Sequence, residues 1–126
     1  MDPRFVTKKI HAFLDYPVAV VLLAAPFLLG LGGSHVLALW LSVVVGAAAL
    51  VLTLLTDHML GVVRVLPYTL HIAVDAAVGV TFVTAPFLLG FEGLDLVYYL
   101  ANGAAVLTVV SLHKPEATAP HPVVTA

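Results

Sequence analysis

The fold of this chain is decided by a stretch of twenty residues that occurs twice. Residues 11–30 read HAFLDYPVAVVLLAAPFLLG, and residues 71–90 read HIAVDAAVGVTFVTAPFLLG. At this offset of 60, ten of the twenty positions are identical, including the whole hexapeptide APFLLG. At an offset of 57, GAAALVLTLL from Gly46 matches GAAVLTVVSL from Gly103. The chain is therefore two copies of one unit, and the second copy lacks three residues between its two halves.

The composition places both copies in a membrane. Hydrophobic residues make up 62% of the 126 positions, charged residues make up 10%, and the mean hydropathy is +1.13. A soluble domain carries about 25% charged residues, so this chain has too little charge to coat a water-facing surface. We therefore exclude a soluble enzyme and a disordered protein. A net charge of −2 without a basic stripe excludes a nucleic-acid binder. The lack of cysteine excludes disulfides and thiolate-ligated metals.

Four apolar runs are long enough to cross a bilayer as helices. They cover residues 10–31, 36–56, 66–91 and 94–112. At 1.5 Å per residue each is about 28–39 Å long, and a hydrocarbon core is about 30 Å thick. The runs are apolar nearly all round, which indicates helices in contact with lipid and with one another. The predicted fold is an all-α integral membrane four-helix bundle made of two tandem transmembrane hairpins. Because each copy has two spans, the copies run in the same direction.

The cations predict the orientation of the chain. They lie before the first span, between the second and third spans, or after the fourth: Arg4, Lys8, Lys9, Arg64 and Lys114. The positive-inside rule then puts both termini in the cytoplasm, and we expect a bacterial inner membrane. The first span is too long for a cleaved signal peptide, so we expect it to be retained. The predicted organisation is a cytoplasmic segment, a first hairpin, a cytoplasmic linker, a second hairpin and a disordered cytoplasmic tail, at residues 1–9, 10–56, 57–65, 66–112 and 113–126.

The repeat carries a polar pair inside an apolar helix. His11 and Asp15 are four residues apart, as are His71 and Asp75, so each pair lies on one helix face. A carboxylate within a span costs about 2.5–3.5 kcal/mol unless it is partnered or hydrated. Because both repeats carry this costly carboxylate at the equivalent position, we expect it to have a structural or functional role. Pseudo-twofold symmetry places all four side chains at one depth.

Three interpretations of these four residues stay open. The first is a hydrogen-bonded cluster that joins the repeats and needs no cofactor. The second is a site for haem or a divalent metal, with His11 and His71 as ligands. The third is proton or ion handling, because histidine titrates near neutral pH. A further polar group is expected at the cytoplasmic face, formed by Asp57, His58, Arg64 and Tyr68.

Proline, glycine and alanine predict where the helices end and touch. Pro26 and Pro86 each remove a backbone donor, so we expect a kink or an early helix end at both. Small residues let helix backbones approach closely in lipid. The candidate contact residues are Gly46, Gly103, Ala19 and Gly79. Because Ala19 and Gly79 continue the stripe of the His/Asp pairs, we expect the first and third spans to cross closely there.

The repeat unit resembles that of the SPW-repeat integral membrane proteins. In that family the first helix of the hairpin ends in Ser-Pro-Trp, and the corresponding tripeptides here are Ala-Pro-Phe at 25–27 and 85–87. HAFLDY at 11–16, TDHMLGVVRVLP at 56–67 and HIAVD at 71–75 also look like the family pattern. The resemblance covers about residues 8–112. It implies a fold and a membrane location, and it provides no catalytic residues.

These features favour a protein without catalytic activity. The sequence has no nucleophile–base pair, phosphate loop or dinucleotide motif, and the loops are short. We expect an accessory or scaffolding subunit that packs in the lipid bilayer against itself or other membrane subunits, without nucleic acid and without a cofactor. The alternative is a protein that binds haem or a divalent metal, or handles protons or ions, through the four His and Asp residues.

Overall fold

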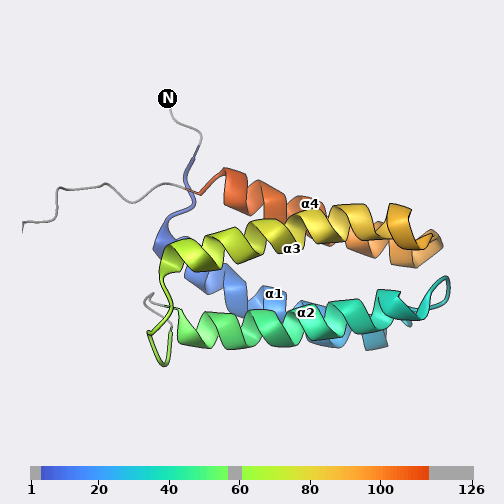
Figure 1. Ribbon diagram of the computed structural model, residues 1–126, viewed down its shortest axis with the longest axis horizontal. Helices are drawn as coiled ribbons and strands as arrows, with labels where there is room; N and C mark the ends of the chain where they lie inside the picture. Colours follow the sequence, from blue (N-terminus) through green and yellow to red (C-terminus); the bar gives the residue numbers. More distant parts are fainter. Residues whose placement is uncertain (1–3, 57–60, 114–126) are drawn as a thin grey trace, which may run out of the picture.

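A computed structural model describes residues 4–56 and 61–113 of the chain. Four helices follow one another: α1 (Lys8–Leu28), α2 (Val36–Leu55), α3 (Tyr68–Leu89) and α4 (Gly93–Ser111). All four are long and apolar enough to cross a membrane. They pack in two pairs, α1 with α2 and α3 with α4, and the pairs lie as two layers (Figure 1). The predicted all-α membrane fold of two hairpins is confirmed.

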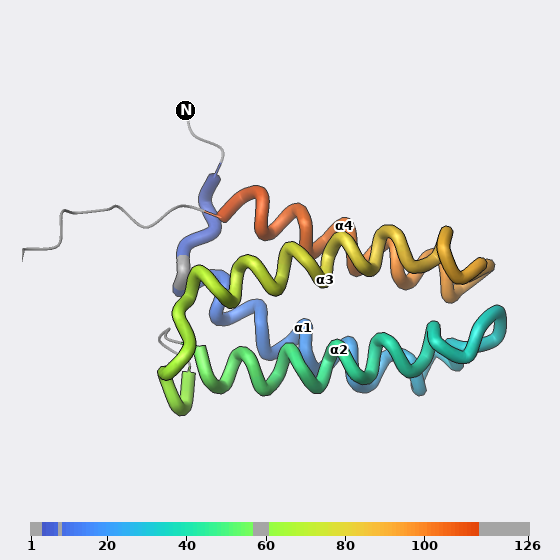
Figure 2. The backbone as a smooth tube through the Cα atoms, viewed as in Figure 1, coloured from blue at the N-terminus to red at the C-terminus, as the bar shows by residue number. Residues whose placement is uncertain are grey.

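The two ends of the bundle differ in what they carry. At one end, called here the basal end, α1 begins, α4 ends, and the chain passes from α2 to α3 (Figure 2). At the other, called the loop end, a short connection joins the two helices of each hairpin. The helix bounds lie within a few residues of those predicted. Helix α1 begins two residues earlier than expected, because the Thr7 hydroxyl accepts a hydrogen bond from the Ile10 N–H and caps the helix.

The duplicated sequence gives a duplicated backbone at the basal end. The N–H of Val6, just before α1, donates to the Leu112 carbonyl after α4 at 3.0 Å. The N–H of Leu66, just before α3, donates to the Leu55 carbonyl at the end of α2 at 2.8 Å. Val6 and Leu66 are equivalent at the offset of 60, and Leu55 and Leu112 are equivalent at the offset of 57. Each hairpin is therefore tied to the other by the same backbone contact.

The glycines permit close packing within each hairpin. A Cβ atom added to Gly46 of α2 meets Leu22 of α1 at 2.9 Å, and one added to Gly103 of α4 meets Val83 of α3 at 2.7 Å. Neither position has room for a side chain without movement of the facing helix. Gly46 and Gly103, the first residues of the two GAA segments, therefore allow α2 to pack closely on α1 and α4 to pack closely on α3.

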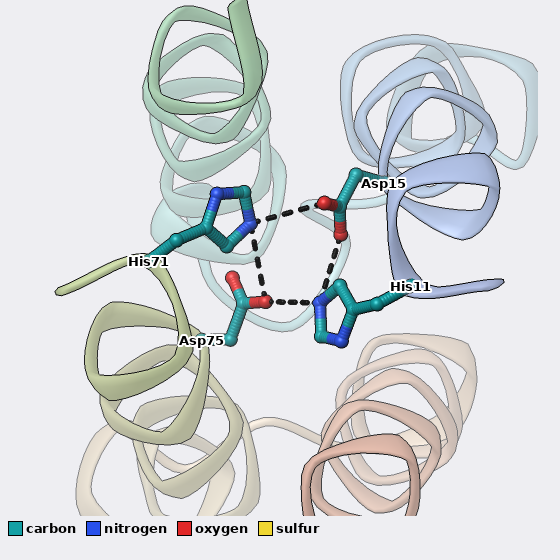
Figure 3. Close-up of side chains that lie close together, drawn as sticks. All are labelled: His11, Asp15, His71 and Asp75. Carbon is teal, nitrogen blue, oxygen red and sulfur yellow. Dashed lines mark hydrogen bonds and ion pairs between the residues drawn. The ribbon is translucent and has the colours of Figure 1, made fainter. Parts of the chain in front are cut away.

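The expected close crossing of the first and third spans is wrong. Gly79 of α3 faces Leu107 of α4, where an added Cβ atom meets the Leu107 side chain at 2.7 Å. Ala19 of α1 is fully buried. Helices α1 and α3 instead lie diagonally opposite each other across the centre of the bundle, and α2 and α4 occupy the other two corners (Figure 3). Near the start of the two helices, histidine and aspartate side chains reach across from α1 to α3.

Both repeated prolines lie just before a helix end, as expected. Helices α1 and α3 continue past Pro26 and Pro86 and end two and three residues later. In each case the proline carbonyl accepts a hydrogen bond at 2.9 Å from the residue five positions on, Leu31 or Phe91. The two helices therefore end in equivalent ways. Gly90, at φ 73°, supplies the left-handed residue that caps α3.

Because proline has no N–H, Pro26 leaves one carbonyl of α1 without its helical hydrogen bond. A side chain of another helix donates to this carbonyl instead. The Ser42 hydroxyl of α2 donates to the Leu22 carbonyl at 2.9 Å. Because that proton is used, the Tyr98 hydroxyl of α4, at 2.7 Å, donates to the Ser42 oxygen. A serine side chain commonly satisfies a backbone group freed by proline in a membrane helix. Here it also connects the first hairpin to the second.

The loop end holds a second connection between the hairpins. Asp95 in the first turn of α4 is 3% exposed. Its carboxylate accepts hydrogen bonds from the Gly32 N–H at 2.9 Å, the Ser34 N–H at 3.0 Å and the Ser34 hydroxyl at 2.5 Å. The Ser34 oxygen accepts in turn from the Glu92 N–H at 3.1 Å. The α1–α2 loop is thus held by the N-terminus of α4.

Gly103→Val tests the seating of α4 on α3. The new side chain has to displace the backbone of α3, and overpacking of this kind costs about 1–3 kcal/mol. We expect a lower Tm in thermal unfolding of the detergent-solubilised protein. Gly33→Val is the control, because no atom lies within 4 Å of a Cβ atom built there. Equal Tm values for the two variants would contradict this packing.

Asp95→Asn tests the connection at the loop end. The amide nitrogen faces backbone donors, so at least one charge-assisted hydrogen bond is lost, which costs roughly 1.5–3 kcal/mol. Glu92→Gln is the matched control, since it removes the same charge from an exposed side chain nearby. We expect the free energy of unfolding to fall for Asp95→Asn alone. If the free energy of unfolding fell similarly in both variants, the cause would be the change in net charge and not the loss of the Asp95 contacts.

Candidate functional site: a buried His/Asp cluster

Four polar side chains meet near the basal end of the bundle. His11 and Asp15 come from the first turns of α1, and His71 and Asp75 come from the first turns of α3 (Figure 3). His11 and His71 are 2% and 1% exposed, and Asp15 is 8% exposed. The i, i+4 spacing directs each pair to the centre of the bundle, where α1 and α3 face each other. We call these four residues the His/Asp cluster.

Histidine and aspartate alternate around the cluster. The His11 Nε2 atom lies 3.0 Å from Asp15 Oδ1 and 2.7 Å from Asp75 Oδ2. The His71 Nε2 atom lies 3.2 Å from Asp15 Oδ2 and 3.3 Å from Asp75 Oδ2. Each imidazole therefore has a carboxylate on both sides, one from its own helix and one from the other hairpin. The four side chains therefore form a ring in which histidine and aspartate take turns (Figure 3).

A threonine fixes the proton on one imidazole. The Thr56 hydroxyl, at the end of α2, donates to the Leu52 carbonyl at 2.6 Å. It also lies 2.7 Å from His71 Nδ1, so its oxygen accepts from an N–H at that position. With Nδ1 protonated, a neutral His71 carries its lone pair on Nε2, the atom that faces the carboxylates. Thr56 is fully buried, so this hydrogen bond is shielded from water.

The equivalent place beside His11 is taken by a histidine. Thr56 and His113 correspond at the offset of 57. The His113 ring lies edge-on to the His11 ring at 5.9 Å between centroids, and Tyr68 lies edge-on to His11 at 6.0 Å. Among the described residues, His11 Nδ1 has no hydrogen-bond partner. The sequence prediction missed the roles of Thr56 and His113; the repeat alignment shows only that the two positions are equivalent.

The cluster has the donor atoms of a metal site. One ligand atom from each of the four residues lies within 4.8 Å of all the others. A tetrahedral site with bonds of about 2.0 Å separates its ligand atoms by about 3.3 Å. The four N–O separations around the cluster, 2.7–3.3 Å, are close to that value. Asp15 enters one of these contacts through Oδ1 and another through Oδ2, so binding of a single ion requires the side chains to move.

An apolar cavity of about 310 Å³ extends from the cluster into the bundle. All four helices line it, and the four cluster residues form part of its wall. Beyond the cluster the wall consists mainly of aliphatic side chains, among them Leu14, Val18, Leu52, Val74, Val78 and Val109. The hairpins are thus joined at both ends and separated by a space in the middle.

The predicted cytoplasmic polar group is only partly described. Asp57 and His58 lie outside the described residues. The Arg64 Nε–H donates to the Gly61 carbonyl at 3.3 Å. Tyr68 begins α3 and is buried, with its hydroxyl 3.4 Å from His113 Nδ1. Tyr68 therefore packs beside the His/Asp cluster and forms part of its surroundings.

The fold agrees with what comparison with known proteins finds. The model of the SPW repeat domain matches residues 9–113, which include both hairpins and all four cluster residues. No curated protein and no solved structure shows a significant match. The family model covers most of the chain and agrees with the earlier resemblance of its repeats. This integral membrane protein belongs to the SPW repeat family.

Proposed function

We propose that this protein is a non-catalytic integral membrane protein whose two hairpins are joined by a divalent metal ion. The ligands are His11, Asp15, His71 and Asp75. The observation that carries the proposal is the alternating arrangement of the cluster, in which one ligand atom from each of the four residues lies within 4.8 Å of the others between the repeats. Each hairpin supplies one nitrogen and one oxygen, so the ion binds only when the hairpins meet.

Charge supports this assignment. Two carboxylates and two neutral imidazoles carry a total charge of −2, which one divalent ion balances within the bilayer. Burying a balanced group costs far less than burying separate charges. Imidazole and carboxylate together suit Zn²⁺ and neighbouring transition metals better than Ca²⁺ or Mg²⁺, which prefer oxygen ligands. The Thr56 contact leaves the lone pair of a neutral His71 on Nε2, as a metal ligand requires.

Haem fits this site poorly. The Asp15 and Asp75 carboxylates lie between the two Nε2 atoms, where the plane of a haem ligated by both histidines has to pass. Proton or ion transport is also less well supported. The cavity wall beyond the cluster is largely aliphatic, so it offers few groups to relay a proton or hydrate an ion.

The proposed role is that of an accessory or scaffolding subunit, in a membrane complex or in an oligomer of this chain. Four protein ligands fill a tetrahedral site and leave no open position for a substrate, which is typical of a structural metal. Large apolar side chains on the outside of the bundle, such as Leu28 and Leu88 at 84% and 81% exposed, are available to lipid or neighbouring helices. We further propose that the basal end faces the cytoplasm of a bacterial cell.

Metal analysis of the purified protein tests the site. The chain is purified in mild detergent without a polyhistidine tag, and its metal content is measured by mass spectrometry. Co²⁺ is then added to metal-free protein, because tetrahedral Co²⁺ has a characteristic visible spectrum. We expect one tightly bound ion per chain and a Tm that falls on chelation. A protein that binds no stoichiometric ion, and whose Tm is unchanged by chelator and by added Zn²⁺, would overturn the proposal in favour of a metal-free cluster.

Single substitutions then assign the ligands. Asp15→Asn and His71→Asn each remove one ligand with little change in size. We expect Co²⁺ affinity to fall at least 100-fold in both. His35→Asn is the control, because His35 caps α2 at the loop end, away from the cluster. Asp15→Asn is the more informative variant if His71→Asn fails to fold, since asparagine keeps the shape of aspartate.

Thr56→Val tests whether the threonine positions His71. Without the hydroxyl, the Nδ1 proton loses this acceptor, and loss of such an outer contact typically costs 10–100-fold in metal affinity. We expect that loss, together with a shifted His71 Nδ1 signal in ¹⁵N NMR. Thr53→Val is the control, because its hydroxyl donates to the Ala49 carbonyl of its own helix. A Thr56→Val variant with unchanged affinity and an unchanged signal would show that Thr56 has no such role.

A further inference from the structure

The cavity between the hairpins straddles the pseudo-twofold axis. Its wall is built largely from equivalent positions of the two repeats, such as Leu14 with Val74 and Ala48 with Ala105. The loop-end contact of Ser42 with Tyr98 and the His/Asp cluster at the basal end both hold the hairpins together. The space is therefore a feature of the duplicated fold, and it lies where the two hairpins fail to touch.

The shape and chemistry of the cavity restrict what occupies it. The wall follows α1 from His11 to Leu22, a rise of about 16 Å, so the cavity of about 310 Å³ is extended along the bundle. This volume is at the lower end of the range for small-molecule sites. An apolar space does not hold water well. If it stayed empty, its wall would lose dispersion contacts along the whole length.

We propose that the cavity binds a single alkyl chain with an uncharged, hydrogen-bonding head group at the His/Asp cluster. The aliphatic wall suits the chain, and the length of the space favours a linear molecule over a compact one. The head meets Asp15 and Asp75 as well as two imidazoles. A hydroxyl donates to a carboxylate oxygen. An anionic head has no proton to donate there, and it adds an unpaired negative charge inside the bundle, which is costly to bury. A fatty alcohol has this chemistry, and a fatty acid anion does not.

Dodecanol is a suitable probe, and dodecanoate is its charged counterpart. Binding to the full-length protein in nanodiscs is measured by native mass spectrometry and by competition with a fluorescent alkyl alcohol. We expect one dodecanol per chain and at least tenfold weaker binding of dodecanoate. Nanodiscs without added alcohol show whether the acyl chain of a phospholipid takes the same place. A co-purifying phospholipid that dodecanol does not displace would overturn the proposed head-group selectivity.

Two double variants locate the site. Ala48→Leu with Ala105→Leu fills the cavity from equivalent positions on α2 and α4. Ala47→Leu with Ala104→Leu is the control, because these neighbours, which are exposed like Ala48 and Ala105, do not line the cavity. We expect the filled variant to lose dodecanol binding at least tenfold while its Tm stays at or above that of the wild type. The control variant should bind normally.

Equal binding by the filled variant and the wild type would overturn the proposal, as would no binding by the wild type. The inference does not depend on the metal. Because neither alanine belongs to the His/Asp cluster, Co²⁺ binding in the filled variant shows whether the metal site is intact. Loss of dodecanol binding with normal Co²⁺ binding assigns the ligand to the cavity. If the wild type does not bind Co²⁺, the proposed metal site is contradicted and the alkyl-chain proposal still stands.

Discussion

The hydrocarbon core of a bilayer offers no water to satisfy a polar group, and this constraint explains most of the structure. Every buried donor or acceptor needs a partner from the protein. In this chain several of the partners come from the other hairpin. The carboxylates of α1 and α3 reach imidazoles across the bundle, Asp95 reaches the backbone of the opposite loop, and Tyr98 reaches Ser42. Apolar packing holds each hairpin together and continues between the hairpins in a core that includes Leu22, Ala38, Phe82 and Tyr99, and polar contacts add to this joint.

The same constraint explains why the sequence predicted some features well. Length and hydropathy were sufficient for the four helices, and the repeat was sufficient for two equivalent hairpins. The i, i+4 spacing, repeated at the same depth, correctly brought His11, Asp15, His71 and Asp75 together. The family resemblance was confirmed by the match to residues 9–113.

Other features depend on which helices are neighbours, and the periodicity of one helix does not determine this. Small residues at Ala19 and Gly79 suggested contact between α1 and α3, but a glycine shows only that some helix comes close, and for Gly79 that helix is α4. Thr56 was missed because it lies at the end of one span and acts on another. The role of Asp95 was not predicted, because nothing local indicates that a distant loop folds over it.

The alternation of histidine and aspartate has a consequence for the history of the molecule. Half of the contacts lie within a hairpin and half lie between hairpins, and the two halves are chemically the same. A dimer of two identical two-helix peptides would form the same ring of histidine–aspartate contacts around a twofold axis. The present chain then corresponds to such a dimer after gene fusion. Differences that a dimer forbids, such as Thr56 on one side and His113 on the other, became available once the two halves were encoded together.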